Sequence, residues 1–407
     1  MTYERAYEKA KEFRQEHILT YYQELTECEQ VQLCKQIEEL DFSLIPLALE
    51  QKESGKGEIS PLRAMELEEI DEKRELYYGI GIEAIQAGKI AALMLAGGMG
   101  TRLGSVQPKG MYNIGIKKHR FIFECQISNL LEVVQEAGVF IPLYIMTSHT
   151  NHKETVAFFQ EHDYFGYEKE SVIFFVQEMA PTTDLQGKVL LEAKGIIASS
   201  PNGNGGWFAS MDHCNLLEDL YEKGIEWINV FAVDNVLQHI ADPYFIGATL
   251  HANSTVGAKV VRKASRDEAV GVICLEDGKP SIVEYYELTD ELMDAVDEQG
   301  NPLYNFGVIL NYLFQVDELK NMLSMQMPLH VVKKKIPYMN EVGEYIQPVE
   351  ENGCKYETLA LDMIHLAHSC LPFEVERNKE FAPIKNKEGK DSIVTARILL
   401  QENGIEL

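Results

Sequence analysis

The sequence has no excess of positive charge and no long apolar run. Its 37 Lys and Arg residues stand against 64 Asp and Glu residues, which gives a formal net charge of −27. Such an acidic chain is a poor partner for nucleic acid or for an anionic membrane surface. No run of about 18 apolar residues occurs, so no segment is expected to span a membrane. A nucleotide ligand stays possible, because its binding depends on the local field of a loop rather than on net charge.

Paired cysteines and a leader segment are also missing. The seven cysteines are scattered, and no two of them form a Cys-x-x-Cys motif. An odd number of unclustered cysteines favours a reduced, intracellular protein. The N-terminal stretch MTYERAYEKAKEFRQEH is charged and lacks an apolar core, so no signal peptide is predicted. These absences predict a cytoplasmic protein and leave its oligomeric state open.

The pattern of the chain changes near residue 88. Before it, the sequence is charged and helical in spacing, with a Thr26–Glu29 capping box before a helix that reaches about Leu40. A polar break is expected at 51–61, and a second helix at 62–87. After it, apolar strands are expected at 90–96, 141–147, 172–176 and 225–233, with helices at 121–137 and 153–162. This alternation predicts an α/β fold with a mixed, mostly parallel sheet flanked by helices.

The stretch 93–110, LMLAGGMGTRLGSVQPKG, joins the first expected strand to a glycine-rich turn. Glycines lack a Cβ, so the backbone N–H groups of this turn can approach a ligand closely. Arg102 and Lys109 add positive charge, which favours a polyphosphate. The dinucleotide fingerprint fails, because Leu103 stands where its third glycine belongs, and the P-loop pattern fails around Lys109. A tight turn without a ligand is the alternative interpretation.

Here the chain resembles a known family. The motif L-A-G-G-x-G-T-R-L-G followed by P-K-G is similar to the signature of the UDP-sugar pyrophosphorylases, most closely of the UDP-N-acetylhexosamine branch. The resemblance runs from about residue 20 to residue 397 and suggests a short, bacterial-type member. It implies a Rossmann-like, glycosyltransferase-A-like nucleotidyltransferase fold. The expected domains are a helical N-terminal region (1–87), a catalytic domain (88–385) and a short C-terminal segment (386–407), with the family's C-terminal domain absent or vestigial.

Asp234 follows the apolar run VFAV, in the motif V-D-N. A carboxylate at the end of a strand can hold Mg²⁺, which prefers one or two carboxylates together with phosphate oxygens. A helix N-cap or turn aspartate is the alternative from the residues alone. The resemblance implies that Asp234 binds both the metal and the sugar phosphate.

The other site residues are implied by the resemblance, motif by motif. The loop SPNGNGG (200–206) is similar to the family's P-D-G-N-G-G, YNFG (304–307) to F-N-A-G, and HVVKKKIPY (330–338) to H-V-x-x-K-K-I-P-Y. The implied nucleotide contacts are Leu95, Ala96, Gly97, Gly98, Lys109, Gln177, Gly203 and Lys334. The implied sugar contacts are Asn204, Asp234, Gly271, Glu284 and Asn305. Further candidate phosphate contacts are Lys335 and Lys385.

Each of these motifs also has a structural interpretation. The 200–206 loop could be a surface loop, Gln177 a solvent-facing side chain, Glu284 part of a hairpin, and the lysine run 333–335 a solvated face. Phe306 stands where the family has alanine, which gives a bulkier pocket wall that could alter the preference among sugars.

These features predict a uridylyltransferase that makes UDP-sugar and pyrophosphate from UTP and a sugar 1-phosphate, with Mg²⁺ as cofactor. The expected catalytic residues are Arg102 and Lys109. The expected sugar is N-acetylglucosamine or N-acetylgalactosamine, with glucose or galactose as the alternative. A nucleotide-sugar sensor without catalysis is a second hypothesis. A glycosyltransferase is disfavoured, because the chain has V-D-N in place of a D-x-D metal motif.

Overall fold

A computed structural model describes residues 1–50 and 57–407. The described chain forms two compact units, each built from three segments. Unit 1 takes the described residues of Met1–Gly55 together with Glu178–Gly206 and Met327–Leu359, and unit 2 takes the rest. The predicted domain boundaries at 87/88 and 385/386 do not coincide with the edges of these units, and the domain division stays a prediction. Among the described residues, no helix has the length and apolar character needed to cross a membrane.

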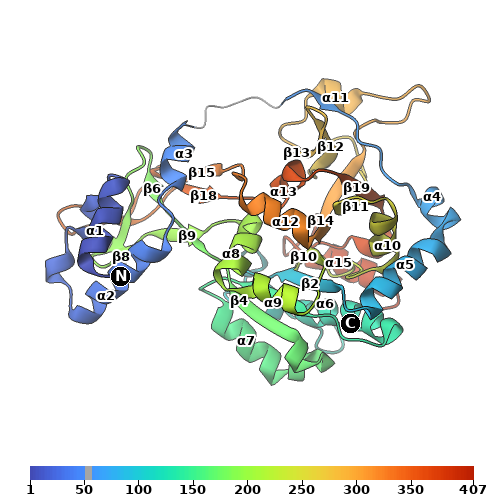
Figure 1. Cartoon of the computed structure of the whole chain (residues 1–407), viewed down its shortest axis with the longest axis horizontal. Helices are drawn as coiled ribbons and strands as arrows, with labels where there is room; N and C mark the ends of the chain where they lie inside the picture. The colour runs from blue at the N-terminus through green and yellow to red at the C-terminus, as the bar shows by residue number, and fades with distance from the viewer. Residues whose placement is uncertain (51–56) are drawn as a thin grey trace. The chain divides into compact units, whose positions relative to one another are not determined.

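Unit 2 is built on a ten-stranded mixed sheet whose main path runs β1-β12-β14-β10-β2-β3-β4 (Figure 1). Its strands are β1 (Ile59–Ser60), β2 (Ile90–Leu95), β3 (Leu143–Thr147), β4 (Val172–Val176), β10 (Trp227–Ala232), β11 (Val256–Arg262), β12 (Val272–Glu276), β13 (Lys279–Val283), β14 (Phe306–Gln315) and β19 (Cys370–Glu374). The strands β10, β2, β3 and β4 are parallel neighbours. They are the four strands expected from the sequence, and the α/β class is confirmed.

The helices of unit 2 pack against its sheet and complete the hydrophobic core. They are α4 (Leu67–Glu72), α5 (Arg74–Gln86), α6 (Ile122–Ala137), α7 (His152–Glu161), α8 (Trp207–His213), α9 (Leu216–Glu222), α10 (Pro243–His251), α11 (Asp290–Asp294), α12 (Val316–Leu323), α13 (Asp362–Leu366), α14 (Arg377–Glu380) and α15 (Ile393–Glu402). Apolar faces of α5, α6, α10 and α15 pack with the parallel strands in one buried cluster. The helices predicted at 121–137 and 153–162 are therefore confirmed to within a residue.

Two features of the sheet differ from the sequence-based prediction. Strand β14 runs antiparallel to β10, β11 and β12, so the antiparallel share of the sheet is larger than predicted. The single helix predicted at 62–87 is wrong. Met65 is extended and pairs with β19, its N–H donating to Pro372 O at 2.9 Å, and helix α4 begins only at Leu67. Pairing with a strand some 300 residues away overrides the local helical spacing.

Unit 1 combines N-terminal helices with three small sheets. Its helices are α1 (Tyr3–Glu12), α2 (Glu27–Glu39) and α3 (Leu44–Glu50). Its sheets are β15-β18-β6, β17-β16-β7-β8 and β5-β9. The strands are β5 (Met179–Pro181), β6 (Thr183–Asp184), β7 (Leu191–Ala193), β8 (Ile196–Ile197), β9 (Ser199–Pro201), β15 (His330–Lys334), β16 (Tyr338–Met339), β17 (Tyr345–Ile346) and β18 (Gly353–Glu357).

The start of α2 follows the sequence prediction. Thr26 accepts from the N–H of Glu29, and Glu29 accepts from the N–H of Thr26, which is the capping box. The apolar face of the helix, with Leu33 and Ile37, is buried in the core of unit 1. The break predicted at 51–61 lies partly outside the described residues. Its described end forms β1, which pairs with β12.

Candidate functional site

The glycine-rich turn leaves the sheet at the carboxyl end of β2. Ala96 donates its N–H to Met146 O and accepts at its carbonyl from Asn151, so the start of the turn is anchored to β3 and α7. The turn then folds back on itself: Gly100 N–H donates to Gln107 O at 2.9 Å, and Lys109 N–H donates to Gly98 O at 3.1 Å. This closed turn returns Lys109 to the edge of the sheet from which the turn began.

Asp234 lies at the same edge. Strand β10 is parallel to β2 and in register with it, with Ala232 opposite Leu95, so both chains leave the sheet side by side. Lys109 Nζ lies 3.3 Å from Asp234 Oδ2, and both side chains are largely shielded, with 16% and 22% of their surface exposed. The carboxyl edge of a parallel sheet is where ligands bind in α/β proteins. The structure therefore joins two predicted residues that are 125 positions apart.

Gln177 follows β4 at the same edge and is not solvent-facing. The Gln177 side chain is buried, and the backbone N–H of Gln177 donates to Thr147 O at the end of β3. A Cβ placed on Gly97 would lie 3.0 Å from Gln177 Oε1, so the turn and this amide are in close contact. Two of the predicted nucleotide contacts, Gly97 after β2 and Gln177 after β4, thus lie next to each other.

Arg102 stays on the outside of the turn. It lies in a short 3₁₀ segment, Thr101–Leu103, and is exposed. Within the described residues, no ion pair holds its guanidinium. An exposed guanidinium on a phosphate-type loop is accessible to a ligand, and the predicted role of Arg102 stays a prediction.

The predicted sugar residues of unit 2 lie around the start of β14. Because β14 runs antiparallel to β10, its first residues lie at the edge where β10 ends. Asn305 precedes this strand, and its carbonyl accepts from Lys263 N–H. Gly271 O accepts from Val308 N–H, and a Cβ on Gly271 would come within 3.6 Å of the Glu284 carboxylate. Glu284 is half-buried rather than on the surface.

Phe306 has a partner within its own sheet. It pairs in register with Arg262, whose guanidinium carbon lies 5.0 Å from the Phe306 ring centroid. Arg262 is itself held by Glu66 and Glu374 at 2.6 and 2.7 Å. Stacking on Arg262 is a structural reason for an aromatic residue at position 306. The effect of Phe306 on sugar preference stays a prediction.

Lys385 follows a segment that contacts Asp234 through the backbone. Ile384 N–H donates to Asp234 O at 2.9 Å. The Lys385 ammonium is turned toward Asp391, at 3.6 Å, and is 43% exposed. The structure thus places Ile384, the residue before Lys385, beside the candidate metal residue, while the Lys385 side chain makes only a long ion pair.

The remaining predicted residues belong to unit 1. Gly203 has φ +89°, and a Cβ there would lie 2.2 Å from Thr358 O. Gly205 donates its N–H to the same carbonyl, so the loop packs against 358–359 and is not a free surface loop. Asn204 is half-buried at its turn, and the packing of the loop by itself accounts for glycine at 203.

The lysine run 333–335 is exposed at the end of β15 in unit 1. Lys334 pairs in register with Gly353, and its carbonyl accepts from Asn352 N–H. Nothing in this arrangement favours Lys334 over Lys335. The choice between them stays a prediction.

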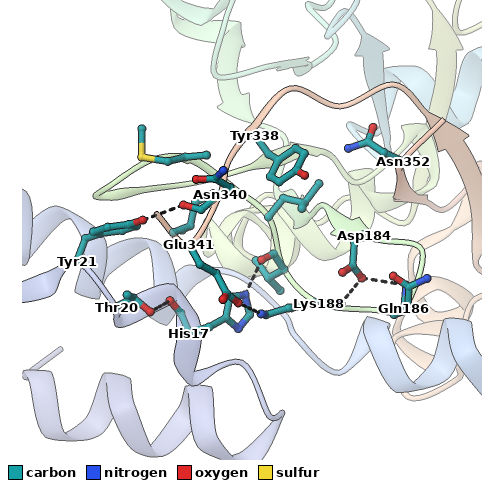
Figure 2. Close-up of a pocket in the computed structure, with 14 residues that line it drawn as sticks. His17, Thr20, Tyr21, Asp184, Gln186, Lys188, Tyr338, Asn340, Glu341 and Asn352 are labelled. Carbon is teal, nitrogen blue, oxygen red and sulfur yellow. Dashed lines mark hydrogen bonds and ion pairs between the residues drawn. The ribbon is translucent and has the colours of Figure 1, made fainter. Parts of the chain in front are cut away.

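Unit 1 also contains a cavity of about 400 Å³ between its helical segment and two sheets, shown in Figure 2. Several polar groups that line this cavity are hydrogen-bonded or ion-paired to other residues of the protein. His17 Nε2 lies 2.7 Å from Val189 O, Tyr21 donates to Asn340 O, and Lys188 pairs with Glu341. Burial lowers the pKa of His17, which keeps this imidazole neutral. The cavity contains none of the residues predicted for the site.

Two groups of side chains in unit 2 are candidates for a metal site. At Asp234, one carboxylate lies at the phosphate-type loop, and within the described residues no hydrogen bond reaches its Oδ1. This fits Mg²⁺, which is commonly held by one or two carboxylates plus substrate phosphates. A denser acidic cluster, His239, Asp242 and Glu380, fits a metal poorly. The buried Lys259 ammonium already fills it, at 2.8 Å from Asp242 and 2.5 Å from Glu380.

The residues that hold this edge in place were not among those predicted from the sequence. The buried Gln126 of α6 bonds to the backbone on both sides of Asp234, and the buried side chain of Asn235 bonds to the backbone of Glu380 and Ala382. One signal was available: Gln126 falls on the apolar face of its helix, between Phe123 and Leu130. A polar side chain on such a face must find partners in the interior.

A glycine-rich turn and a carboxylate at the carboxyl edge of an α/β sheet define a nucleotide-binding class of protein. Residues 46–403 match the family described as UTP--glucose-1-phosphate uridylyltransferase (UDPGP). The chain belongs to this family.

Named relatives agree with this assignment. The chain is 40% identical to "UDP-N-acetylglucosamine pyrophosphorylase" of Saccharomyces cerevisiae, over 86% of this chain and 77% of the yeast protein. It is 39% identical to "UDP-N-acetylhexosamine pyrophosphorylase-like protein 1" of Mus musculus, over 76% of this chain and 63% of the mouse protein. A crystal structure of the uridine diphosphate N-acetylglucosamine pyrophosphorylase from Trypanosoma brucei superposes with a TM-score of 0.82 at 27% identity, over 97% of this chain and 83% of that one. These relatives are eukaryotic, so they give no support to the expectation of a bacterial-type short form.

The turn suggests a first prediction. Gly98 is exposed and a Cβ on it would meet nothing within 4 Å, so alanine fits the free protein. If UTP lies against this turn, Gly98→Ala is expected to raise the KM for UTP about tenfold, the effect of ~1.4 kcal/mol of lost binding. The melting temperature is expected to stay unchanged. Steady-state kinetics and thermal unfolding measure the two quantities.

Gly79→Ala is the matched control. It is also exposed, with open space around it, and lies inside α5. Alanine there is expected to stabilise the helix by about 1 kcal/mol and to leave the KM unchanged. An unaltered KM in Gly98→Ala would place the nucleotide away from the turn.

Proposed function

We propose that this chain transfers the uridylyl group of UTP to N-acetylglucosamine 1-phosphate, giving UDP-N-acetylglucosamine and pyrophosphate. One observation supports the proposal most directly: the Lys109–Asp234 pair, at 3.3 Å, at the carboxyl edge of the sheet in a member of the UDPGP family. A cation and a carboxylate at one phosphate-type loop suit a reaction between two phosphates. The names of the yeast and mouse relatives support an N-acetylhexosamine as the sugar.

The chemistry needs no protein nucleophile. An oxygen of the sugar phosphate attacks the α-phosphorus of UTP in line, and pyrophosphate leaves. The attacking phosphate is already an anion, so no general base is required. What the protein supplies is position and charge, because two anionic reactants repel each other. We assign charge neutralisation to Arg102 and Lys109.

In this proposal the glycine-rich turn of unit 2 holds the nucleotide. The backbone of Leu95, Ala96, Gly97 and Gly98 lines the nucleotide, and the buried amide of Gln177 hydrogen-bonds to the uracil edge. An amide suits this edge, since it offers both a donor and an acceptor. We further assign Gly203 to the nucleotide and Lys334, with Lys335 as the alternate, to the phosphates. Lys385 is a further candidate for a phosphate contact.

The sugar phosphate binds next to Asp234. We assign its hydroxyl and amide groups to Asn204, Gly271, Glu284 and Asn305. Asp234 would hold Mg²⁺, which supplies charge neutralisation and alignment of the triphosphate. Lys109 Nζ lies 3.3 Å from the Oδ2 atom of this carboxylate. The cytoplasm remains the predicted location.

Pyrophosphate release from UTP and Mg²⁺ with a panel of sugar 1-phosphates tests the proposal. The fastest release is expected with N-acetylglucosamine 1-phosphate, and much slower release with ATP or TTP in place of UTP. Fastest release with glucose or galactose 1-phosphate would keep the reaction and correct the sugar. No release with any sugar, in protein that still binds UDP-sugar, would replace the enzyme by a nucleotide-sugar sensor.

A further inference from the structure

One buried amide is bonded to the backbone on both sides of Asp234. Gln126, on the inner face of α6, is fully buried. Its Nε2 donates to Val233 O at 2.8 Å and to Asn235 O at 2.8 Å. These two carbonyls belong to the residues that flank Asp234. The single NH₂ group of Gln126 therefore fixes the path of the chain through the candidate metal residue.

The orientation of this amide is determined by its surroundings. Carbonyl oxygens only accept, so the nitrogen of Gln126 must face them. Its Oε1 in turn accepts from Gln238 Nε2 at 3.2 Å, and Gln238 Oε1 accepts from Asn311. Asn229 of β10 continues the series by donating to Asn311 Oδ1 at 2.7 Å. Four buried amides thus link α6, the loop after β10, β14 and β10 beneath Asp234.

The opposite side of the loop is held as well. Ile384 N–H donates to Asp234 O, and the Asn235 side chain bonds to Glu380 O and Ala382 N–H. These bonds do not involve Gln126, so they remain when the Gln126 amide is replaced. An apolar residue would satisfy the packing of α6 against the sheet. What the buried glutamine adds is the placement of two particular carbonyls.

We infer that Gln126 is a positioning residue for Asp234, which sets the direction of the carboxylate and thereby the affinity of the site for a divalent cation with its nucleotide. The inference rests on the proposed function, in which Asp234 binds the metal together with UTP. Partners behind a metal ligand typically change affinity or activity about 10- to 100-fold when removed. An effect of that size is expected here.

Asn129 provides a matched control on the same helix. Its Nδ2 donates to Val236 O at 3.3 Å and to Gln238 O at 3.0 Å, two carbonyls further along the same loop. Asn129→Leu and Gln126→Met each remove one amide that bonds to this loop. Only Gln126→Met removes hydrogen bonds to Val233 and Asn235, the neighbours of Asp234. If Gln126→Met fails to fold, Gln126→Glu keeps the side-chain volume and replaces the NH₂ group by an oxygen, which donates to at most one of the two carbonyls and only when protonated.

The experiment measures Mn²⁺ binding in the presence of UTP by electron paramagnetic resonance, together with the melting temperature of each variant. Mn²⁺ serves as the paramagnetic probe for Mg²⁺. The expected result is Mn²⁺ affinity lowered about 10- to 100-fold in Gln126→Met and less than about twofold in Asn129→Leu, with both melting temperatures lowered. The Mg²⁺ concentration for half-maximal pyrophosphate release is expected to rise in parallel for Gln126→Met.

Equal Mn²⁺ affinities in the wild type and Gln126→Met, or equal losses in both variants, would overturn the inference. Absence of Mn²⁺ binding with UTP in the wild type would overturn it too. The proposed function fails separately, when the wild-type protein releases no pyrophosphate. An inactive wild type whose Mn²⁺ affinity still depends on Gln126 would keep the inference and reject the reaction.

Discussion

Replacing Lys109 by methionine is expected to lower kcat by about 10²- to 10³-fold, the usual loss when one group that stabilises transition-state charge is removed. Methionine keeps the length of the side chain and removes its charge. The ammonium lies at the loop where we place the triphosphate, and negative charge on the leaving pyrophosphate grows as the bond to the α-phosphorus breaks. The KM for UTP is expected to change less than kcat, because the added charge develops only in the transition state.

Lys118→Met is the control for this prediction. Lys118 lies on the chain that follows the turn and makes a surface pair with Glu406 at 3.5 Å. Its loss is expected to leave kcat unchanged and to alter stability by less than about 1 kcal/mol. Stopped-assay pyrophosphate release, with UTP and sugar 1-phosphate saturating, compares the two variants. A kcat for Lys109→Met within threefold of the wild type would remove Lys109 from the catalytic machinery.

The second large effect concerns stability. Lys259 is fully buried and touches two shielded carboxylates, Asp242 and Glu380, while its ammonium also donates to His239 O. Lys259→Met leaves both carboxylates in the interior without their cation. Breaking a buried pair in this way typically destabilises a protein by about 3–5 kcal/mol. This loss of stability is expected to lower the urea concentration at the midpoint of unfolding, which tryptophan fluorescence measures.

Tryptophan fluorescence reports on the unit that contains Lys259. Both tryptophans, Trp207 and Trp227, are buried in unit 2, where Lys259 lies. Lys379→Met is the control, because Lys379 pairs with Glu376 at 2.8 Å on an exposed surface of the same unit. It is expected to change stability by less than about 1 kcal/mol. Equal unfolding midpoints for Lys259→Met and the wild type would contradict the prediction.

The effect of Lys259→Met depends on pH with a definite sign. Burial alone would raise the pKa of Asp242, but attraction to Lys259 outweighs it and lowers the pKa below the ordinary value of 3.8. A lowered pKa stabilises the fold above the ordinary value, and the contribution is lost as pH falls through the lowered one. In Lys259→Met burial acts without the attraction to Lys259 and raises the pKa of Asp242, so the variant regains stability as pH falls toward that raised pKa. The difference in stability between wild type and variant is therefore expected to be largest at neutral pH, to begin shrinking above pH 3.8, and to go on shrinking as pH falls through the lowered pKa of the wild type.

Local patterns were enough to predict much of the fold. The four apolar runs that became β2, β3, β4 and β10 were placed within about two residues, since short apolar segments between turns report burial directly. The capping box at Thr26 was confirmed, because its hydrogen bonds join residues three apart. The helix predicted at 62–87 was wrong at its start, since the N–H of Met65 bonds to Pro372 in β19.

By itself, the sequence determined which residues the proposed site draws on: a glycine-rich turn with Arg102 and Lys109, a carboxylate after an apolar strand, and motifs that resemble a uridylyltransferase family. These depend on neighbours in the chain. Only the tertiary structure decided that Lys109 meets Asp234, and that Gln126 bonds to the carbonyls flanking it. The physical reason is the same in both cases. Strand register and the packing of α6 bring together groups more than 100 residues apart, and no local periodicity records which distant partner a buried polar group will find.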